Sequence, residues 1–183
     1  MIFFTADTHF GHKNIIKYCK RPFGSVKEMD ETMIERWNAV VKPGDLVYHA
    51  GDFALASPQY TASVINKLNG QIYLCKGSHD KSALHPACRG LFVTIKESFK
   101  IKVGDQTIFI AHHCHKIWPK SHYGVWHLFG HSHGGMDAYA ASEGKLLDVG
   151  VDNNLFTPLT FEQISDIMDR RPKNFNDLER KHE

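Results

Sequence analysis

Residues 71–80 read Q-I-Y-L-C-K-G-S-H-D, and the fold can be worked out from this stretch. The apolar run 72–75 is short and a glycine follows it closely, which is typical of a buried strand that ends at a loop. Ser78, His79 and Asp80 come next. These three residues form either a polar turn that ends the strand or one edge of an active site, and other parts of the chain decide between the two.

The same order, an apolar run followed by Asp or His, occurs at four other places. The clusters are Asp7, Thr8 and His9 after residues 2–6, Gly51 and Asp52 after 46–50, His112 and His113 after 107–111, and Gly130, His131, Ser132 and His133 after 127–129. Ligands of open α/β sheets gather at the carboxyl ends of strands, because the loops there converge on one crevice. The five clusters together therefore predict one site.

Helical patterns separate the first three of these runs. Residues 25–41 begin with Ser25 and Glu28 at the spacing of a capping box, and apolar residues follow at helical spacing. Residues 57–68 begin with a serine and Pro58, which suit the N-cap and the first turn of a helix. Strands that alternate with helices predict an α/β sheet whose neighbouring strands are parallel.

The second half of the chain has a different character. Residues 99–111 contain two apolar runs joined at a Gly-Asp pair and predict a hairpin, residues 145–151 predict a strand, and residues 160–170 predict a final helix. No linker divides the two halves. We therefore expect one domain with two packed sheets over residues 1–170, followed by a charged C-terminal tail, 171–183.

Composition excludes several classes of protein. Apolar residues make up 42% and charged residues 23% of the 183, which is near the globular average and excludes disorder and coiled coils. The net charge of +2 gives no broad basic field, so a nucleic-acid partner is permitted but not indicated. No stretch has the length of a membrane span or the order of a signal peptide, which predicts a cytoplasmic protein without a membrane partner. Nothing in the sequence predicts an oligomeric state.

Histidine is unusually frequent, and its placement points to metal. Seven of the 13 histidines lie within 22 residues, from His112 to His133, whereas His182 in the tail is expected to be a solvated surface residue. The four cysteines are scattered and include no C-x-x-C pair, so neither a zinc ribbon nor a disulfide framework is expected. Two carboxylates and four or more imidazoles can hold two divalent ions if one carboxylate bridges them. Such a pair can bind a phosphoryl oxygen and ionise water near neutral pH, which favours phosphoester hydrolysis.

The order of the five clusters resembles the calcineurin-like metallophosphoesterase superfamily. The matching elements are D-x-H at Asp7 and His9, G-D at Asp52, a G-N-H-D-like element at 77–80, a strand-terminal histidine, and G-H-x-H at His131 and His133. The small single-domain phage and bacterial members are the most similar. The resemblance implies a four-layer α/β/β/α sandwich with two central mixed sheets. It also implies a phosphodiesterase or phosphomonoesterase for a small phosphoester, with a metal-bridging hydroxide as nucleophile.

The resemblance assigns roles to individual residues. One divalent ion would be bound by Asp7, His9, Asp52 and His133, and a second by Asp52, Ser78, His112 and His131. His112 is preferred to His113 because it directly follows the apolar run. His79 is implied to donate a proton to the leaving oxygen. Manganese, iron, nickel and zinc all suit these ligands, and manganese is favoured.

Ser78 is the departure from the family pattern, which has asparagine at this position. A serine hydroxyl is shorter than an asparagine amide and is a weaker donor to a divalent ion. We therefore expect the second ion to bind more weakly than the first. The alternative function is a catalytically weakened or non-catalytic module that binds metal or phosphate. The sequence selects neither a substrate nor monoester against diester chemistry.

Overall fold

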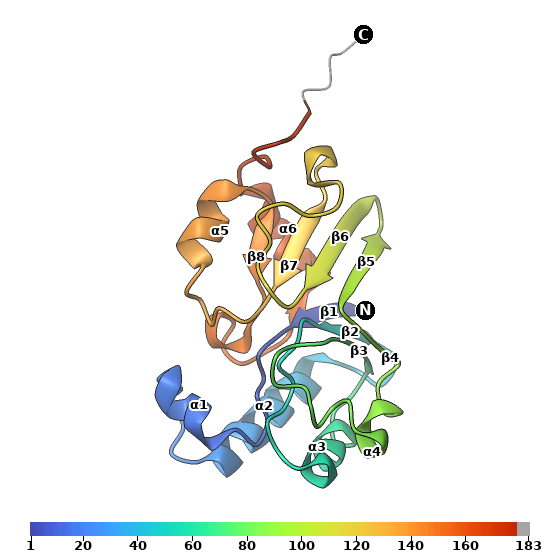
Figure 1. The fold of residues 1–183 in the computed structure, drawn as a ribbon, viewed down its shortest axis with the longest axis vertical. Helices are drawn as coiled ribbons and strands as arrows, with labels where there is room; N and C mark the ends of the chain where they lie inside the picture. Colours follow the sequence, from blue (N-terminus) through green and yellow to red (C-terminus); the bar gives the residue numbers. More distant parts are fainter. Residues whose placement is uncertain (179–183) are drawn as a thin grey trace.

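A computed structural model describes residues 1–178 and contains two packed sheets with helices on their outer sides (Figure 1). In the first sheet the strand order is β4 (Thr94–Lys96), β3 (Gln71–Cys75), β2 (Leu46–His49), β1 (Ile2–Thr5) and β9 (Leu159–Thr160), and all neighbours are parallel except β1 and β9. In the second sheet the order is β5 (Ser98–Val103), β6 (Gln106–Ala111), β7 (Trp126–Phe129) and β8 (Leu146–Asp148), with only β5 and β6 antiparallel. Both sheets are therefore mixed, as expected.

Helices complete the outer layers. The first sheet is covered by α1 (Lys13–Tyr18), α2 (Val26–Val40), α3 (Pro58–Ile65) and α4 (Pro86–Arg89), and the second by α5 (Asp137–Glu143). The last helix, α6 (Phe161–Asp169), adds Ile164 and Met168 to the core between the sheets. Two short 3₁₀ turns, Ser121–Tyr123 and Val151–Asn153, lie in the connections. The predicted α/β/β/α sandwich is confirmed.

The strands are apolar throughout because both faces of each sheet are covered. In β1, Phe3 packs among the helices of the first outer layer, whereas its neighbour Phe4 packs between the two sheets. In β6, Ile110 points into the same inner core and Phe109 packs in the cluster that includes α5. Successive side chains of a strand point to opposite faces, so each strand links two layers of core.

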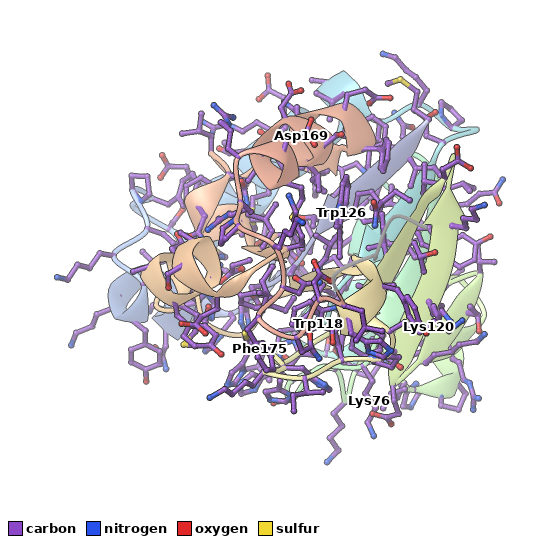
Figure 2. All side chains as sticks on the ribbon, turned by 90° about the horizontal axis from the view of Figure 1, so that it is seen from above. Lys76, Trp118, Lys120, Trp126, Asp169 and Phe175 are labelled. Atoms are coloured by element: carbon purple, nitrogen blue, oxygen red, sulfur yellow. The ribbon has the colours of Figure 1, made fainter. Side chains whose placement is uncertain are left out.

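The aromatic core also attaches α6 to the second sheet. Trp126 of β7 stacks on Phe161 with ring centroids 5.7 Å apart, and only 6% of Trp126 is exposed. Figure 2 shows Trp126 in the interior of the molecule, whereas Lys76 lies at its periphery. No helix within residues 1–178 combines the length and the apolar character needed to cross a lipid bilayer.

Local predictions are mostly confirmed, with differences at the ends of elements. Ser25 accepts the N–H of Glu28 as expected, but the Glu28 carboxylate accepts the N–H of Gly24, so the capping box is only half formed. The predicted hairpin forms with Val103 paired to Gln106. Helix α3 ends at Ile65, three residues earlier than expected, and the chain continues in turns.

The predicted boundary at residue 170 stays a prediction. Asn174, which lies after that boundary, is buried, and its side chain donates to the carbonyl of Ser121 at 2.7 Å and accepts the N–H of Lys145 at 2.7 Å. Residues 179–183 of the predicted tail, which include His182, lie outside the described residues.

Candidate metal centre

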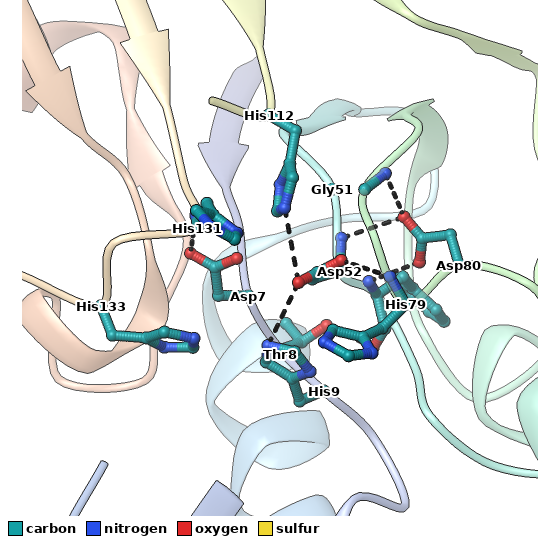
Figure 3. A network of polar contacts seen from close by, with 12 residues as sticks. Asp7, Thr8, His9, Gly51, Asp52, His79, Asp80, His112, His131 and His133 are labelled. Carbon is teal, nitrogen blue, oxygen red and sulfur yellow. Dashed lines mark hydrogen bonds and ion pairs between the residues drawn. The ribbon is translucent and has the colours of Figure 1, made fainter. Parts of the chain in front are cut away.

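The five polar clusters meet where the two sheets adjoin (Figure 3). Strands β1, β2 and β3 are parallel neighbours, and so are β6 and β7, so the carboxyl ends of each group lie at one edge. Asp7, His9 and Asp52 come from the first sheet, whereas His112, His131 and His133 come from the second. The convergence follows from the parallel pairing, which brings together loops far apart in the sequence.

The backbone at these positions is unusual. Among the described residues, nine that are not glycine have a positive φ, and five of them are candidate ligands. The five are Asp7 (55°), His9 (50°), Asp52 (56°), His131 (68°) and His133 (46°). A left-handed conformation is unfavourable for residues with a side chain and is retained where the surroundings impose it, often at functional sites. The strain here is concentrated in the loops that aim the candidate ligands.

Asp52 lies between two groups of imidazoles. Its Oδ2 atom is 3.6 Å from His9 Nε2 on one side and 3.4 Å from His112 Nε2 on the other. Besides a set of Cys19, His133 and Asp152, three sets of ligand atoms lie within 4.8 Å of one another: Asp7, His9 and His133; Asp7, Asp52 and His112; and His112, His113 and His131. The second set links the first to the third, so the donors form one continuous cluster.

Several buried oxygen and nitrogen atoms of this cluster, of the kinds that bind metal ions, have no hydrogen-bond partner among the described residues. These atoms are Asp7 Oδ1, both ring nitrogens of His9, and His112 Nε2. Buried polar atoms in folded proteins nearly always have a partner, so four such atoms at one place need an explanation. Carboxylate oxygen and imidazole nitrogen are ligands for divalent first-row ions. The cluster therefore fits metal binding.

Burial sets the protonation of the site. Burial raises the pKa of Asp7 to about 7 and lowers the pKa of His9 to about 3. Burial also opposes ionisation of Asp52, but the adjacent His112 outweighs it and holds the pKa of Asp52 below its ordinary value. Burial lowers the pKa of His112, but the negative charge of Asp52 outweighs it, so the pKa of His112 is raised. A positive charge placed beside Asp7 would offset the burial and keep the carboxylate ionised.

Two of the histidines are oriented by their second ring nitrogen. His112 Nδ1–H donates to the carbonyl of Ala50 at 2.9 Å, which leaves Nε2 directed at Asp52. His133 Nδ1–H donates to Asp152 Oδ2 at 2.7 Å. Such outer contacts fix the tautomer and the direction of a ligand histidine.

A buried arginine supports this arrangement. Arg21 donates to both carboxylate oxygens of Asp152, at 2.7 and 2.8 Å, and to the carbonyls of Asp7 and Thr8 at 2.7 and 3.0 Å. It thereby connects the carboxylate that orients His133 to the strand end that carries Asp7. Sequence reasoning missed this pair, because 131 positions separate Arg21 from Asp152 and no spacing signal links them.

Ser78 and His79, neighbours in the stretch 71–80, lie on two different sides of the site. His79 is exposed and lines a hollow of about 400 Å³, where its ring centroid lies 5.5 Å from that of His9. Ser78 is also exposed but lines a different hollow of about 390 Å³, with His112 and His113. The hydroxyl of Ser78 makes no hydrogen bond within residues 1–178, so of the eight candidate residues it has the weakest connection to the cluster.

Asp80 has a role that its position in the motif does not reveal. Its carboxylate accepts three backbone N–H groups, from Asp52 at 2.9 Å, Phe53 at 2.7 Å and Gly77 at 2.8 Å. Asp80 thereby fastens the loop that follows β3 to the loop that carries Asp52.

Gly51 is required where β2 approaches His112. Its φ is +102°, and a Cβ atom built there would lie 2.5 Å from His112 Nδ1. We expect Gly51→Ala to lower the free energy of unfolding of the metal-free protein by about 1–3 kcal/mol, the usual cost of one strained residue. Urea unfolding would measure it. The matched control is Gly90→Ala, where φ is −74° and a Cβ would meet nothing within 4 Å; equal losses in both variants would contradict the explanation.

Comparisons with known proteins agree with the fold. No family model matches the chain. A protein of unknown function, AQ665 from Aquifex aeolicus, has a similar structure, with a TM-score of 0.73 and 22% identity over 91% of this chain and 98% of that one. Yfce, a phosphoesterase from E. coli, is more distant, with a TM-score of 0.43 and 18% identity over 81% and 77% of the two chains, too low to support an inference.

One curated sequence is similar to this chain over almost its whole length. The chain is 31% identical over 189 residues to the uncharacterized protein MJ1445 of Methanocaldococcus jannaschii, and the alignment covers 97% of each chain. Identity at this level over almost the whole length of both proteins indicates common descent. The chain therefore belongs to the same protein family as MJ1445.

Proposed function

We propose that the chain is a metal-dependent phosphoesterase of the calcineurin-like type. The observation that carries the proposal is the convergence of Asp7, Asp52 and several imidazoles, with buried donor atoms that lack partners. One divalent ion would be bound by Asp7, His9, Asp52 and His133, and a second by Asp52, His112 and His131 with Ser78 at the remaining position. Asp52 suits the bridging role because both His9 and His112 approach its Oδ2 atom.

When bound, two such ions would allow a water molecule between them to ionise near neutral pH. They would also place positive charge beside the phosphoryl oxygens. The protein's part is to fix the donors before substrate arrives. Asp80 holds the backbone around Asp52, and Asp152 with Arg21 orients His133. Preorganised groups of this kind need no rearrangement during the reaction, which is a large part of their catalytic value.

His79 is proposed as the proton donor to the leaving oxygen. Its backbone N–H donates to Asp52 Oδ1 at 2.8 Å, which keeps residue 79 next to the cluster while its ring stays in the open hollow. An imidazole at hydrogen-bond distance from a developing alkoxide can donate a proton to it. The hollow also has apolar walls from Ile15, Tyr18 and Leu55 and is wide enough for the organic part of a small phosphoester.

Metal removal and restoration tests the proposal. We expect purified protein to hydrolyse p-nitrophenyl phosphate or bis-p-nitrophenyl phosphate with added Mn²⁺, to lose this activity after chelation, and to regain it when Mn²⁺ returns. The ratio of the two rates would also separate monoester from diester preference. The exposed hydroxyl of Ser78, with no hydrogen bond among the described residues, favours the second candidate, a non-catalytic binding module. Metal binding without turnover of either substrate would support that module and contradict the enzyme.

A further inference from the structure

Three imidazoles face one another on the β6 and β7 side of the candidate centre. The ring centroids of His112 and His113 are 4.8 Å apart, those of His113 and His131 are 4.5 Å apart, and those of His112 and His131 are 5.0 Å apart. One nitrogen from each ring lies within 4.8 Å of the others. His112 is buried against Asp52, whereas His113 and His131 are exposed at the rim.

The placement of His113 depends on where β6 ends. In a regular strand, consecutive side chains point to opposite faces, so His112 and His113 could not both bind the same metal ion. Strand β6 stops at Ala111, however, and the chain bends at the next two residues. The bend brings both rings to the same side, and their planes cross at 73°.

The backbone on both sides of Ser78 is tied by hydrogen bonds. The N–H of Gly77 donates to the Asp80 carboxylate at 2.8 Å, and the N–H of His79 donates to Asp52 at 2.8 Å. The backbone on either side of Ser78 is therefore fixed, and the side chain between these two bonds is short and exposed. Ser78 and His113 nevertheless line the same hollow, so they border the same part of the site.

We infer that His113 supplies the metal ligand that Ser78 does not, so that the second divalent ion is bound by Asp52, His112, His113 and His131. This inference rests on the proposed function, since it concerns the same metal centre. Three imidazoles with one carboxylate suit zinc, iron or nickel better than manganese, which prefers oxygen ligands. The second position is thus chemically different from the first, which has two carboxylates and two imidazoles.

Metal titration of matched variants tests the inference without relying on activity. The proteins are wild type, His113→Ala, the control His115→Ala, and the double variant Ser78→Asn with His113→Ala. His115 is also exposed and lines the same hollow, but it is not part of the three-ring cluster. Each protein is stripped of metal, titrated with Zn²⁺ against a chromophoric chelator, and dialysed for elemental analysis. Thermal unfolding of the stripped proteins establishes that all variants fold.

We expect wild type and His115→Ala to bind two ions per chain. In His113→Ala the affinity for the second ion should fall by about tenfold or more, because loss of even an outer contact to a ligand costs roughly 10–100-fold. Binding of the first ion should be unchanged. In the double variant, asparagine at position 78 should restore most of the lost affinity, since it offers an oxygen to the position that His113 has left.

The outcomes separate this inference from the proposed function. If wild type binds no ion, the proposed metal centre itself is wrong. If wild type binds two ions and His113→Ala binds the second one equally tightly, only the role of His113 is wrong. If His113→Ala loses the second ion and Ser78→Asn does not restore it, positions 78 and 113 do not serve the same coordination position, which also overturns the inference.

Discussion

Asp52→Asn should abolish metal-dependent hydrolysis and weaken the binding of both ions by more than roughly 100-fold, the upper end of the loss seen when only an outer contact is removed. The reason is the position of Asp52 between His9 and His112, where one carboxylate is proposed to serve both ions. In the proposed assignment Asp52 is the ligand that both ions share, so a substitution of any other ligand should affect one ion more than the other.

The same substitution should lower the stability of the metal-free protein without unfolding it. The lowered pKa of Asp52 means that the fold stabilises the ionised carboxylate beside His112, and a neutral amide loses this attraction while its oxygen still accepts the N–H of His79. Thermal unfolding with and without Zn²⁺ would measure this: the variant starts from a lower melting temperature and loses the stabilisation by metal. Asp105→Asn, at an exposed carboxylate in the β5–β6 turn, is the control. A variant that unfolds without metal would show that Asp52 is structural.

His79→Ala should lower kcat by about 10²–10⁴-fold on a substrate with a poor leaving group, with metal content unchanged. The effect should be much smaller on p-nitrophenyl esters, because p-nitrophenolate is a stable anion and leaves without a proton. Comparison of an alkyl phosphoester with a p-nitrophenyl ester therefore identifies a proton donor specifically. The N–H of residue 79, which donates to Asp52, is kept in the variant.

His122→Ala provides the control for this experiment, since His122 lies on the 3₁₀ turn Ser121–Tyr123 outside the cluster. Equal losses on both substrates would argue against proton donation by His79. A lower metal content in His79→Ala would instead make residue 79 a ligand or a support for one. The two measurements together assign the residue a role whichever result is obtained.

The fold class could be predicted from the sequence because apolar runs indicate which segments of the chain are buried. Strands β1, β2 and β3 are covered on both faces, and their continuous apolar runs show this. The short elements were missed for a related reason. Helix α4 has four residues and strand β9 has two, too few for any periodicity to develop, and both are stabilised by their neighbours in the fold.

The candidate site was predictable as a set of residue types but not as a geometry. Asp7, His9 and Asp52 could be identified as candidates because each lies within three residues of the end of an apolar run. Their left-handed backbone conformations could not, since nothing in the local sequence requires a positive φ there. The link from Arg21 through Asp152 to His133 depends entirely on tertiary contacts, and so does the bend that brings His113 beside His112.

The origin of the candidate ligands in both sheets has a consequence for how the molecule opens. Asp7, His9 and Asp52 belong to the first half of the chain, and His112, His131 and His133 to the second. Ions bound among them would add a cross-link between two halves that already contact through the apolar core and through hydrogen bonds such as that of His112 to the carbonyl of Ala50. Local opening of either sheet would then require metal release, so the loaded protein should exchange its amide hydrogens as one cooperative unit.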